Sequence, residues 1–164
     1  MNEEYPAVIG RIDDGVVIDH ITPHKVSKVQ RILKVDQSNQ VFFSADNLRS
    51  SYLREFGYES KGLLKIDGRS PTDFELNRIA LVAPYATVSI IESGEVARKW
   101  QVRLPDTLEG LVPCPVANCI SNQDYSGVGS IIRVVNETKA VGEERFSCAY
   151  CHHEFGRDAL EDYL

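Results

Sequence analysis

The sequence predicts an α+β protein built from two parts. In the N-terminal part, short β-branched runs alternate with two segments that open on helix-start signals. All four cysteines lie in the last third of the 164-residue chain, in two close pairs. We therefore expect a sheet covered on one face by two helices over residues 1–102, and a small β-rich metal-binding domain over residues 103–164. We expect separate cores, with residues 98–110 as the connector.

The N-terminal part opens with a predicted strand and a predicted helix. Residues 15–21 start with glycine and continue with β-branched side chains, which indicates a strand entered through a turn. Thr22-Pro23 then offers a helix N-cap followed by a proline at the first helical position. Because apolar residues recur at helical spacing after this proline, we expect a helix over about 23–34.

The later elements follow from the same signals. Ser70 is the expected cap of the second helix, with Pro71 at its first position, and Pro84 ends that helix. The last predicted strand pairs with the one before it after a Ser93-Gly94 turn. The sequence does not determine the structure of the connection 49–60. The remaining strands are expected in four runs, at residues 41–45, 62–66, 87–91 and 95–97.

The cysteine spacing predicts one structural zinc ion per chain. Cys114 and Cys119 enclose four residues, Cys148 and Cys151 enclose two, and two such pairs can bring four thiolates to one tetrahedral ion. Two disulfides are the alternative, although Cys-x2-Cys is a poor local disulfide. The two histidines after the last cysteine could in principle replace a thiolate. Four cysteines suffice, however, and they leave no open position for catalysis.

Charge and hydropathy exclude several function classes. The formal net charge is −6, and the segment from residue 111 onward has four basic residues against eight acidic ones. Phosphate contacts come from clustered lysine and arginine, so we expect no general affinity for nucleic acid. No apolar run is long enough to span a bilayer. The chain also has no secretory leader pattern, which favours the reducing cytoplasm.

Short motifs follow one another along nearly the whole chain: Gly-Val-Val-Ile-Asp-His-Ile from Gly15, Lys61 with Lys65-Ile66, Ala-Pro-x-Ala-Thr-Val from Ala83, Leu104-Pro105, Cys-Pro-x3-Cys-Ile from Cys114, and Cys-x-Tyr-Cys from Cys148. Taken in this order, they resemble the regulatory chain of aspartate carbamoyltransferase. The resemblance implies a ferredoxin-like nucleotide-binding domain, followed by a zinc-ribbon or rubredoxin-like domain that docks on the catalytic chain.

The resemblance also implies a function. Members of this family are not themselves catalytic. They bind nucleoside triphosphates of the ATP and CTP type and transmit allosteric control of pyrimidine biosynthesis to the catalytic chains. The resemblance further implies regulatory homodimers that bridge catalytic trimers. A zinc-ribbon adaptor for nucleic acid or for another protein is the alternative, and an enzyme is disfavoured because no acid and base lie near a nucleophile.

By motif position, the resemblance assigns a nucleotide site. It implies that Asp19 and His20 contact the ribose and phosphates, and that three lysines surround the nucleotide: Lys61, Lys65 and Lys99. Apolar side chains would pack around the base: Ile12, Val17, Ile91 and Val96. A triphosphate needs several cations, and lysines on neighbouring strands can supply them.

Other interpretations of these residues remain open at the level of sequence. Alternation along a strand sends Asp19 and His20 to opposite faces, so both can contact one ligand only if the strand bends there. Lysines on strands commonly guard an edge against pairing with another sheet. Lys99 could instead be a solvated connector residue. Ser93-Gly94 and Gly10 depart from the family pattern, so the sequence does not determine which nucleotide binds.

Overall fold

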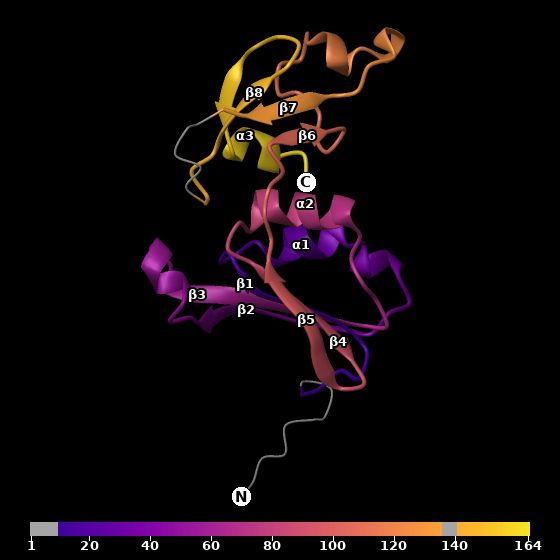
Figure 1. The fold of residues 1–164 in the computed structure, drawn as a ribbon, viewed down its shortest axis with the longest axis vertical. Coiled ribbons are helices and arrows are strands. Elements are labelled where there is room, and N and C mark those ends of the chain that lie inside the picture. The colour runs from indigo at the N-terminus through magenta and orange to yellow at the C-terminus, as the bar shows by residue number, and fades with distance from the viewer. Residues whose placement is uncertain (1–9, 136–140) are drawn as a thin grey trace, which may run out of the picture.

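The computed structural model describes residues 10–135 and 141–164, which form two antiparallel sheets with helices between them (Figure 1). The first part contains β1 (Gly15–Ile21), α1 (Val26–Ile32), β2 (Phe42–Arg49), β3 (Ser60–Asp67), α2 (Asp73–Val82), β4 (Thr87–Glu92) and β5 (Glu95–Gln101). The second part contains β6 (Thr107–Glu109), β7 (Ile131–Val134), β8 (Arg145–Cys148), β9 (Glu154–Gly156) and α3 (Asp158–Glu161). This arrangement confirms the predicted α+β class.

The first sheet has the strand order β2-β3-β1-β4-β5. Its first four strands and two helices follow the β-α-β-β-α-β order of a ferredoxin-like unit, and β5 extends the sheet through the Ser93-Gly94 turn. The second sheet has the order β6-β7-β8-β9. Among the described residues, no helix is both long and apolar enough to cross a membrane.

Alternate residues of the central strands face the helices. Val16 and Ile18 of β1 and Leu64 and Ile66 of β3 are fully buried, whereas Val17 between them is only partly buried. This alternation places the apolar side chains under α1 and α2, and no helix of residues 10–135 or 141–164 covers the opposite face of the sheet. We call that uncovered surface the open face.

The first helix begins three residues later than the sequence predicts. His24 adopts a left-handed backbone conformation with φ of 64°, and its amide donates to Asp46 Oδ1 at 3.2 Å. Thr22 and Lys25 are joined by a turn hydrogen bond, and α1 then starts at Val26. Thr22 is therefore not the cap, because its hydroxyl is buried without a hydrogen-bond partner in the described part of the chain.

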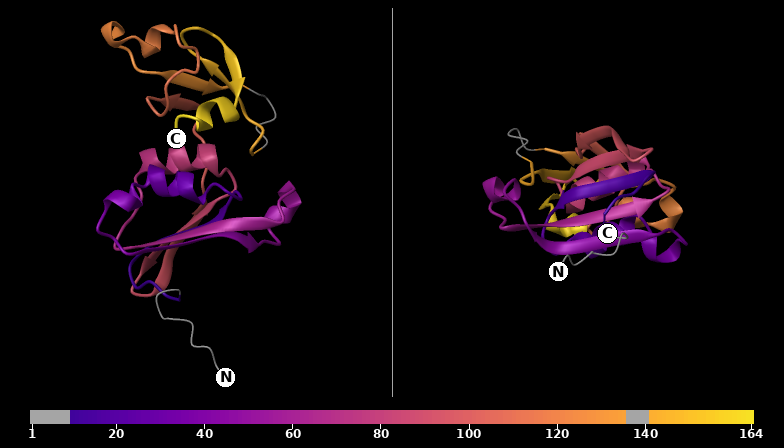
Figure 2. Two further views of the ribbon diagram at one scale, coloured as in Figure 1. Left: turned by 180° about the vertical axis from the view of Figure 1, so that it is seen from behind. Right: turned by 90° about the horizontal axis from the view of Figure 1, so that it is seen from below.

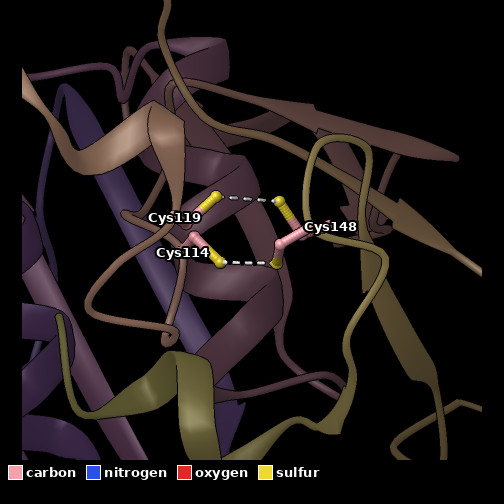
Figure 3. A group of neighbouring side chains, drawn as sticks. Cys114, Cys119 and Cys148 are labelled. Atoms are coloured by element: carbon pink, nitrogen blue, oxygen red, sulfur yellow. Dashed lines mark hydrogen bonds between the residues drawn. The ribbon is translucent and has the colours of Figure 1, made fainter. Parts of the chain in front are cut away.

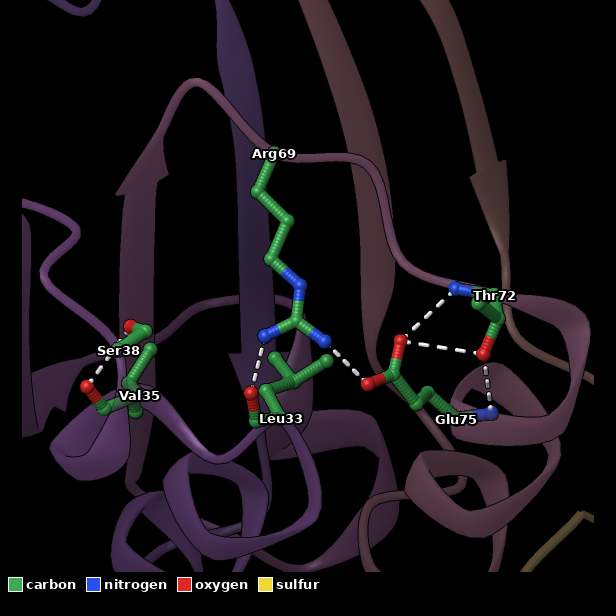
Figure 4. Close-up of polar contacts among 6 residues, drawn as sticks. All are labelled: Leu33, Val35, Ser38, Arg69, Thr72 and Glu75. Atoms are coloured by element: carbon green, nitrogen blue, oxygen red, sulfur yellow. Dashed lines mark hydrogen bonds and ion pairs between the residues drawn. The ribbon is translucent and has the colours of Figure 1, made fainter.

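The second helix is capped by Thr72 rather than by Ser70. Thr72 Oγ1 accepts from the Glu75 amide at 3.3 Å, and the Glu75 carboxylate accepts from the Thr72 amide at 2.9 Å, which is a capping box (Figure 4). The same carboxylate pairs with Arg69, whose guanidinium also donates to the carbonyl of Leu33 just after α1. Arg69 therefore links the end of α1 to the start of α2.

The connector is shorter than predicted. β5 continues to Gln101, so Arg98 and Lys99 lie in a strand that pairs with β4. β6 begins at Thr107, which leaves residues 102–106 to join the two parts. The interpretation of residues 98–110 as a connector was wrong because the charged outer strand carries little apolar alternation, which is the usual strand signal.

The two parts share one apolar core. The layer of α1 and α2 lies between the five-stranded sheet and the second part (Figures 1 and 2). Buried side chains from β1 through α2 form one continuous cluster with Leu108, Ile132, Phe146 and Leu160 of the second part. The expectation of separate cores is therefore wrong, because helices packed on both sides bury apolar residues in both directions.

Cations on α1 reinforce this contact by binding the C-terminal helix. The Lys25 ammonium pairs with the Glu161 carboxylate, and Lys28 donates to the Glu161 carbonyl at 2.7 Å. One turn further along, Arg31 donates to the carbonyl of Leu164 at 3.1 Å. Lys25 at the N-cap of α1, together with Lys28 and Arg31 within the helix, therefore holds α3 and the residues after it.

The observed cap yields a stability prediction. Thr72→Ala removes the side-chain acceptor of the capping box, so we expect the free energy of unfolding to fall by about 1 kcal/mol. Ser70→Ala is the matched control, because Ser70 is also exposed but makes no cap, and its effect should stay within about 0.5 kcal/mol. Urea unfolding followed by circular dichroism measures both. Equal losses in the two variants would contradict the assignment of Thr72 as the cap.

Candidate metal centre and candidate anion site

The four cysteines converge on one point in the second part. Cys114 and Cys119 come from the loop that follows β6, Cys148 ends β8, and Cys151 lies in the turn before β9. Their sulfur atoms all lie within 4.8 Å of one another, and the Cys114–Cys151 and Cys119–Cys148 sulfur distances are both 3.7 Å (Figure 3). A tetrahedral ion about 2.3 Å from each sulfur requires sulfur separations of about 3.8 Å. The geometry therefore fits a closed four-thiolate metal centre.

This geometry contradicts the disulfide alternative. A disulfide needs sulfur atoms about 2.05 Å apart, whereas these pairs are 3.7 Å apart and all four cysteines are free. The histidines that follow the last cysteine, His152 and His153, are exposed and do not belong to the cluster. The predicted ligand set of four cysteines is therefore the one that the structure brings together.

Local hydrogen bonds shape the first cysteine loop. Asn122 Nδ2 donates to the carbonyls of Cys114 at 2.8 Å and Val116 at 2.9 Å, which holds the loop closed. Ser121 Oγ lies 3.2 Å from the sulfur of Cys119. Although burial works to raise it, hydrogen bonds from Ser121 and the neighbouring thiols lower the pKa of Cys119 to about 7. Sequence reasoning missed these residues, because nothing in their spacing marks a supporting contact.

The candidate nucleotide residues gather on the open face of the first sheet. Lys65 of β3 pairs with Val17 of β1, Val17 pairs with Ser89 of β4, and Ser89 pairs with Lys99 of β5. These four residues form one row across four strands, with a lysine near each end. Because β3 lies inside the sheet, the interpretation of Lys61 and Lys65 as edge guards is wrong.

The strand bends where the Asp-His motif requires it. The pairing of β1 with β3 shifts register between Ile18 and Ile21, and His20 has a positive φ of 56°. Asp19 Oδ1 accepts from the His20 amide at 2.7 Å, and the same carboxylate lies 2.8 Å from Lys61 Nζ. Because His20 adopts a left-handed backbone conformation, the side chains do not alternate strictly here, and those of Asp19 and His20 lie on the same side of the sheet.

His20 lies in a positively charged setting. Its Nδ1 lies 3.0 Å from Thr87 Oγ1 of β4, which fixes the ring orientation. Burial lowers the pKa of His20, the Asp19 carboxylate opposes this effect, and the positive charges of Lys61 and Lys99 lower it further. The site therefore favours the neutral imidazole, beside cations that an anion could engage. Thr87 is a site residue that sequence reasoning missed, although it belongs to a quoted motif.

The remaining predicted residues surround this row less closely. Ile91 is nearly buried and pairs with Val96, which is 58% exposed at the edge of the sheet. Lys65 Nζ donates to the carbonyl of Gly10 at 2.9 Å. Ile12 and Lys65 line a depression of about 280 Å³ at the β2 edge, together with Arg11, Asp13, Val41, Phe42, Phe43 and Asp67. We call the polar set Asp19, His20, Lys61, Lys65 and Lys99 the candidate anion site.

Comparisons with known proteins agree with this two-part arrangement. Residues 7–103 match the family described as the aspartate carbamoyltransferase regulatory chain, allosteric domain. Residues 106–161 match the family described as the metal binding domain of the same chain. The chain belongs to the aspartate carbamoyltransferase regulatory chain family. Members of this family are the regulatory, non-catalytic subunit.

Individual regulatory chains support this membership over nearly the whole length. The aspartate carbamoyltransferase regulatory chain of Methanopyrus kandleri is 35% identical over 156 residues, which cover 95% of this chain and 94% of that protein. The regulatory chain of Porphyromonas gingivalis is 36% identical over 154 residues, covering 94% and 95%. That of Methanosarcina acetivorans is 34% identical over 170 residues and covers both chains fully.

The charges around His20 predict opposite effects of two substitutions. Asp19→Asn removes the carboxylate that raises the pKa of His20, so this pKa should fall. Lys61→Met removes a cation that lowers it, so the same pKa should rise. A proton NMR titration of the His20 ring measures both shifts, with Lys34→Met as a control on the helix side of the sheet. Shifts of the same sign in the two site variants would contradict the assigned geometry.

Proposed function

We propose that this chain binds a nucleoside triphosphate of the ATP or CTP type at the candidate anion site and transmits allosteric control of pyrimidine biosynthesis to an aspartate carbamoyltransferase catalytic chain. The observation that carries this proposal is that, within a regulatory-chain family member, Asp19, His20 and Lys61 lie together on the open face, in a sheet whose Lys65 and Lys99 end one row of paired residues. The catalytic chain is the partner that the family name implies.

The charges on the open face suit a polyphosphate. Lys61 and Lys65 come from β3, next to β1, and Lys99 comes from β5, which lies beyond β4 on the other side of β1. Their ammonium groups can therefore contact successive phosphates. Lys61 is held by Asp19 in the absence of a ligand, and a phosphate would compete for it. The partly buried Val17 and the nearly buried Ile91 give the same face apolar surface for a base.

We propose zinc as the metal. Four thiolates in a tetrahedron favour zinc among common divalent ions, because sulfur ligands suit it and the cluster found among the described residues consists of cysteines alone. One structural zinc per chain would hold in place the loop that carries Cys114 and Cys119, where the shared core ends. The free thiols also need a reducing compartment, which supports a cytoplasmic location.

The docking surface for the catalytic chain is proposed on the loop between Cys119 and β7. Ile120 is 44% exposed, Tyr125 is 82% exposed and Val128 is 39% exposed. This loop lies on the side of the second part away from the five-stranded sheet (Figure 1). Exposed aromatic and aliphatic side chains on a metal-fixed loop suit protein docking. The acidic charge of this part does not suit nucleic acid.

We propose that the regulatory homodimer forms through the β2 edge. β2 is an outer strand, and Phe42 and Leu48 on it are 36% and 37% exposed, while Val41 just before it is 64% exposed. Unpaired backbone groups beside apolar side chains are suited to pairing with a second copy.

Nucleotide binding can be tested at Lys99. Lys99→Ala should weaken ATP binding by about 1.5 to 3 kcal/mol, because the substitution removes a charge-assisted contact with phosphate. Lys34→Ala is the control, since Lys34 is also exposed but follows α1 on the covered face. Isothermal calorimetry on the zinc-loaded chain measures both affinities. An unchanged Lys99→Ala affinity would remove Lys99 from the site.

Docking can be tested with Tyr125. Tyr125→Ser should weaken the complex with the catalytic chain by about 2 kcal/mol if this ring is a binding hot spot. Tyr163→Ser is the control, because Tyr163 is 44% exposed but lies after α3. Analytical ultracentrifugation of the reconstituted mixture gives both affinities. Equal affinities for the two variants would move the interface away from this loop.

Because the two parts share one apolar core, metal removal should affect the N-terminal part as well as the metal-binding part. Chelation of the ion should release the catalytic chain, and it should also lower the free energy of unfolding of the N-terminal part, because Leu108, Phe146 and Leu160 belong to the shared core. Hydrogen exchange of α1 and α2 amides before and after chelation measures this effect. Unchanged protection of both helices would show that the N-terminal part is stable alone.

A further inference from the structure

Four aromatic rings form a continuous chain of contacts that starts at the candidate anion site. The centroid of the His20 ring lies 4.6 Å from that of Tyr52, and the Tyr52 centroid lies 5.5 Å from that of Phe56, both in edge-on geometry. Phe56 stacks on Tyr85 with centroids 4.1 Å apart and an interplanar angle of 20°. These separations are close to those of attractive aromatic pairs. We call these four residues the aromatic ladder.

The far end of the aromatic ladder touches the metal-binding part. The Tyr85 hydroxyl donates to the carbonyl of Val141 at 2.9 Å, on the segment that precedes β8. At Gly142, a Cβ atom would lie 2.6 Å from the Tyr85 hydroxyl, so the backbone of Gly142 packs closely against the Tyr85 side chain. Burial raises the pKa of Tyr85, which keeps its hydroxyl a donor.

The same segment is joined to the contact between the two parts. Glu144, two residues beyond Gly142, pairs with Arg157. The buried Arg157 guanidinium in turn donates to the carbonyls of Ala80 at 2.7 Å and Leu81 at 2.6 Å, near the end of α2. A displacement of residues 141–144 would therefore act on the ion pair that holds the second part against the helix layer.

The aromatic ladder passes beside the helix layer rather than through it. The short coil η3 (Leu53–Phe56), which precedes β3, and residues 141–144 of the second part lie on the same side of the molecule (Figures 1 and 2). That coil is anchored at its base, since Leu53 is fully buried and the Leu53 amide donates to Ser50 Oγ at 3.0 Å. Phe56 at its end is 40% exposed, so its ring can leave Tyr85 without opening the core.

We propose that the aromatic ladder couples the candidate anion site to residues 141–144 of the metal-binding part. Tyr52 acts as a positioning residue for His20, and the stacking of Phe56 on Tyr85 is the element with two arrangements, stacked and unstacked. The nucleoside triphosphate as the natural trigger rests on the proposed function. The coupling itself rests only on the ring contacts and on the Tyr85 hydrogen bond.

A bound anion acts on the aromatic ladder by changing the contacts that the His20 ring makes. An anion that takes Lys61 from Asp19 changes the charge around the imidazole, whose pKa is lowered by burial and further by the neighbouring lysines. A ring that turns toward the anion loses part of its contact with Tyr52. A ligand that contacts the two ring positions differently shifts the population between the stacked and unstacked arrangements.

A test without nucleotide separates the coupling from the proposed function. His20→Gln is introduced into the full metal-loaded chain, and the amide NMR signals of residues 141–144 are compared with those of the parent. The same comparison is made in a Phe56→Leu background, which keeps an apolar side chain but removes the ring stack. We expect His20→Gln to shift these signals in the parent and to leave them unshifted in the Phe56→Leu background.

Phe74→Leu is the matched control background. Phe74 is 49% exposed on α2 and outside the aromatic ladder, so the response to His20→Gln should persist there. The proposal is overturned if His20→Gln shifts the signals of residues 141–144 equally in the Phe56→Leu and parent chains, or if it shifts them in neither.

A second measurement uses ATP as the probe. In the parent chain, saturating ATP should shift the signals of residues 141–144. In Tyr85→Phe, which lacks the hydroxyl donor, that shift should be lost while the calorimetric affinity for ATP changes less than about twofold. An undiminished shift in Tyr85→Phe contradicts the role of the hydroxyl. Failure of ATP to bind the parent contradicts the proposed function, whereas the His20→Gln comparison still decides the coupling.

Discussion

The packing of α1 and α2 against both parts is the constraint on which the rest of this structure depends. The sheet that carries the candidate anion site and the sheet that carries the cysteines bury apolar side chains against the same two helices. Arg157 and the cations of α1 close this contact with hydrogen bonds to backbone carbonyls. Because a buried charge is costly without its partners, these bonds tie the relative position of the two parts to their folding.

Much of the fold follows from local sequence signals. The strand at 15–21, the Ser93-Gly94 hairpin and the cysteine pairs were predictable because each depends on residues close together in the chain. The helix starts were misplaced by a few residues, since a left-handed His24 and the Thr72–Glu75 capping box compete with the more obvious proline signals. Those choices depend on contacts with Asp46 and Arg69, which come from other segments.

The site was predictable in its residue types but not in its geometry. The resemblance placed Asp19 and His20 together, yet alternation along a strand argued against it, and only the bend at His20 reconciles the two. The contact of Thr87 with His20 joins residues 67 positions apart, and the aromatic ladder depends on a connection whose structure the sequence left undetermined. Long-range placements of this kind depend on the completed sheet.

We propose that a regulatory nucleotide site lies at one end of this continuous structure and a partner surface at the other. The most direct measurement is the aspartate saturation curve of the catalytic chain, reconstituted with the zinc-loaded chain, with and without ATP or CTP. We expect at least one nucleotide to shift this curve when this regulatory chain is bound to the catalytic chain, and to leave the curve unchanged when the catalytic chain is alone. A complex that assembles fully but gives superimposable curves with and without either nucleotide would contradict it.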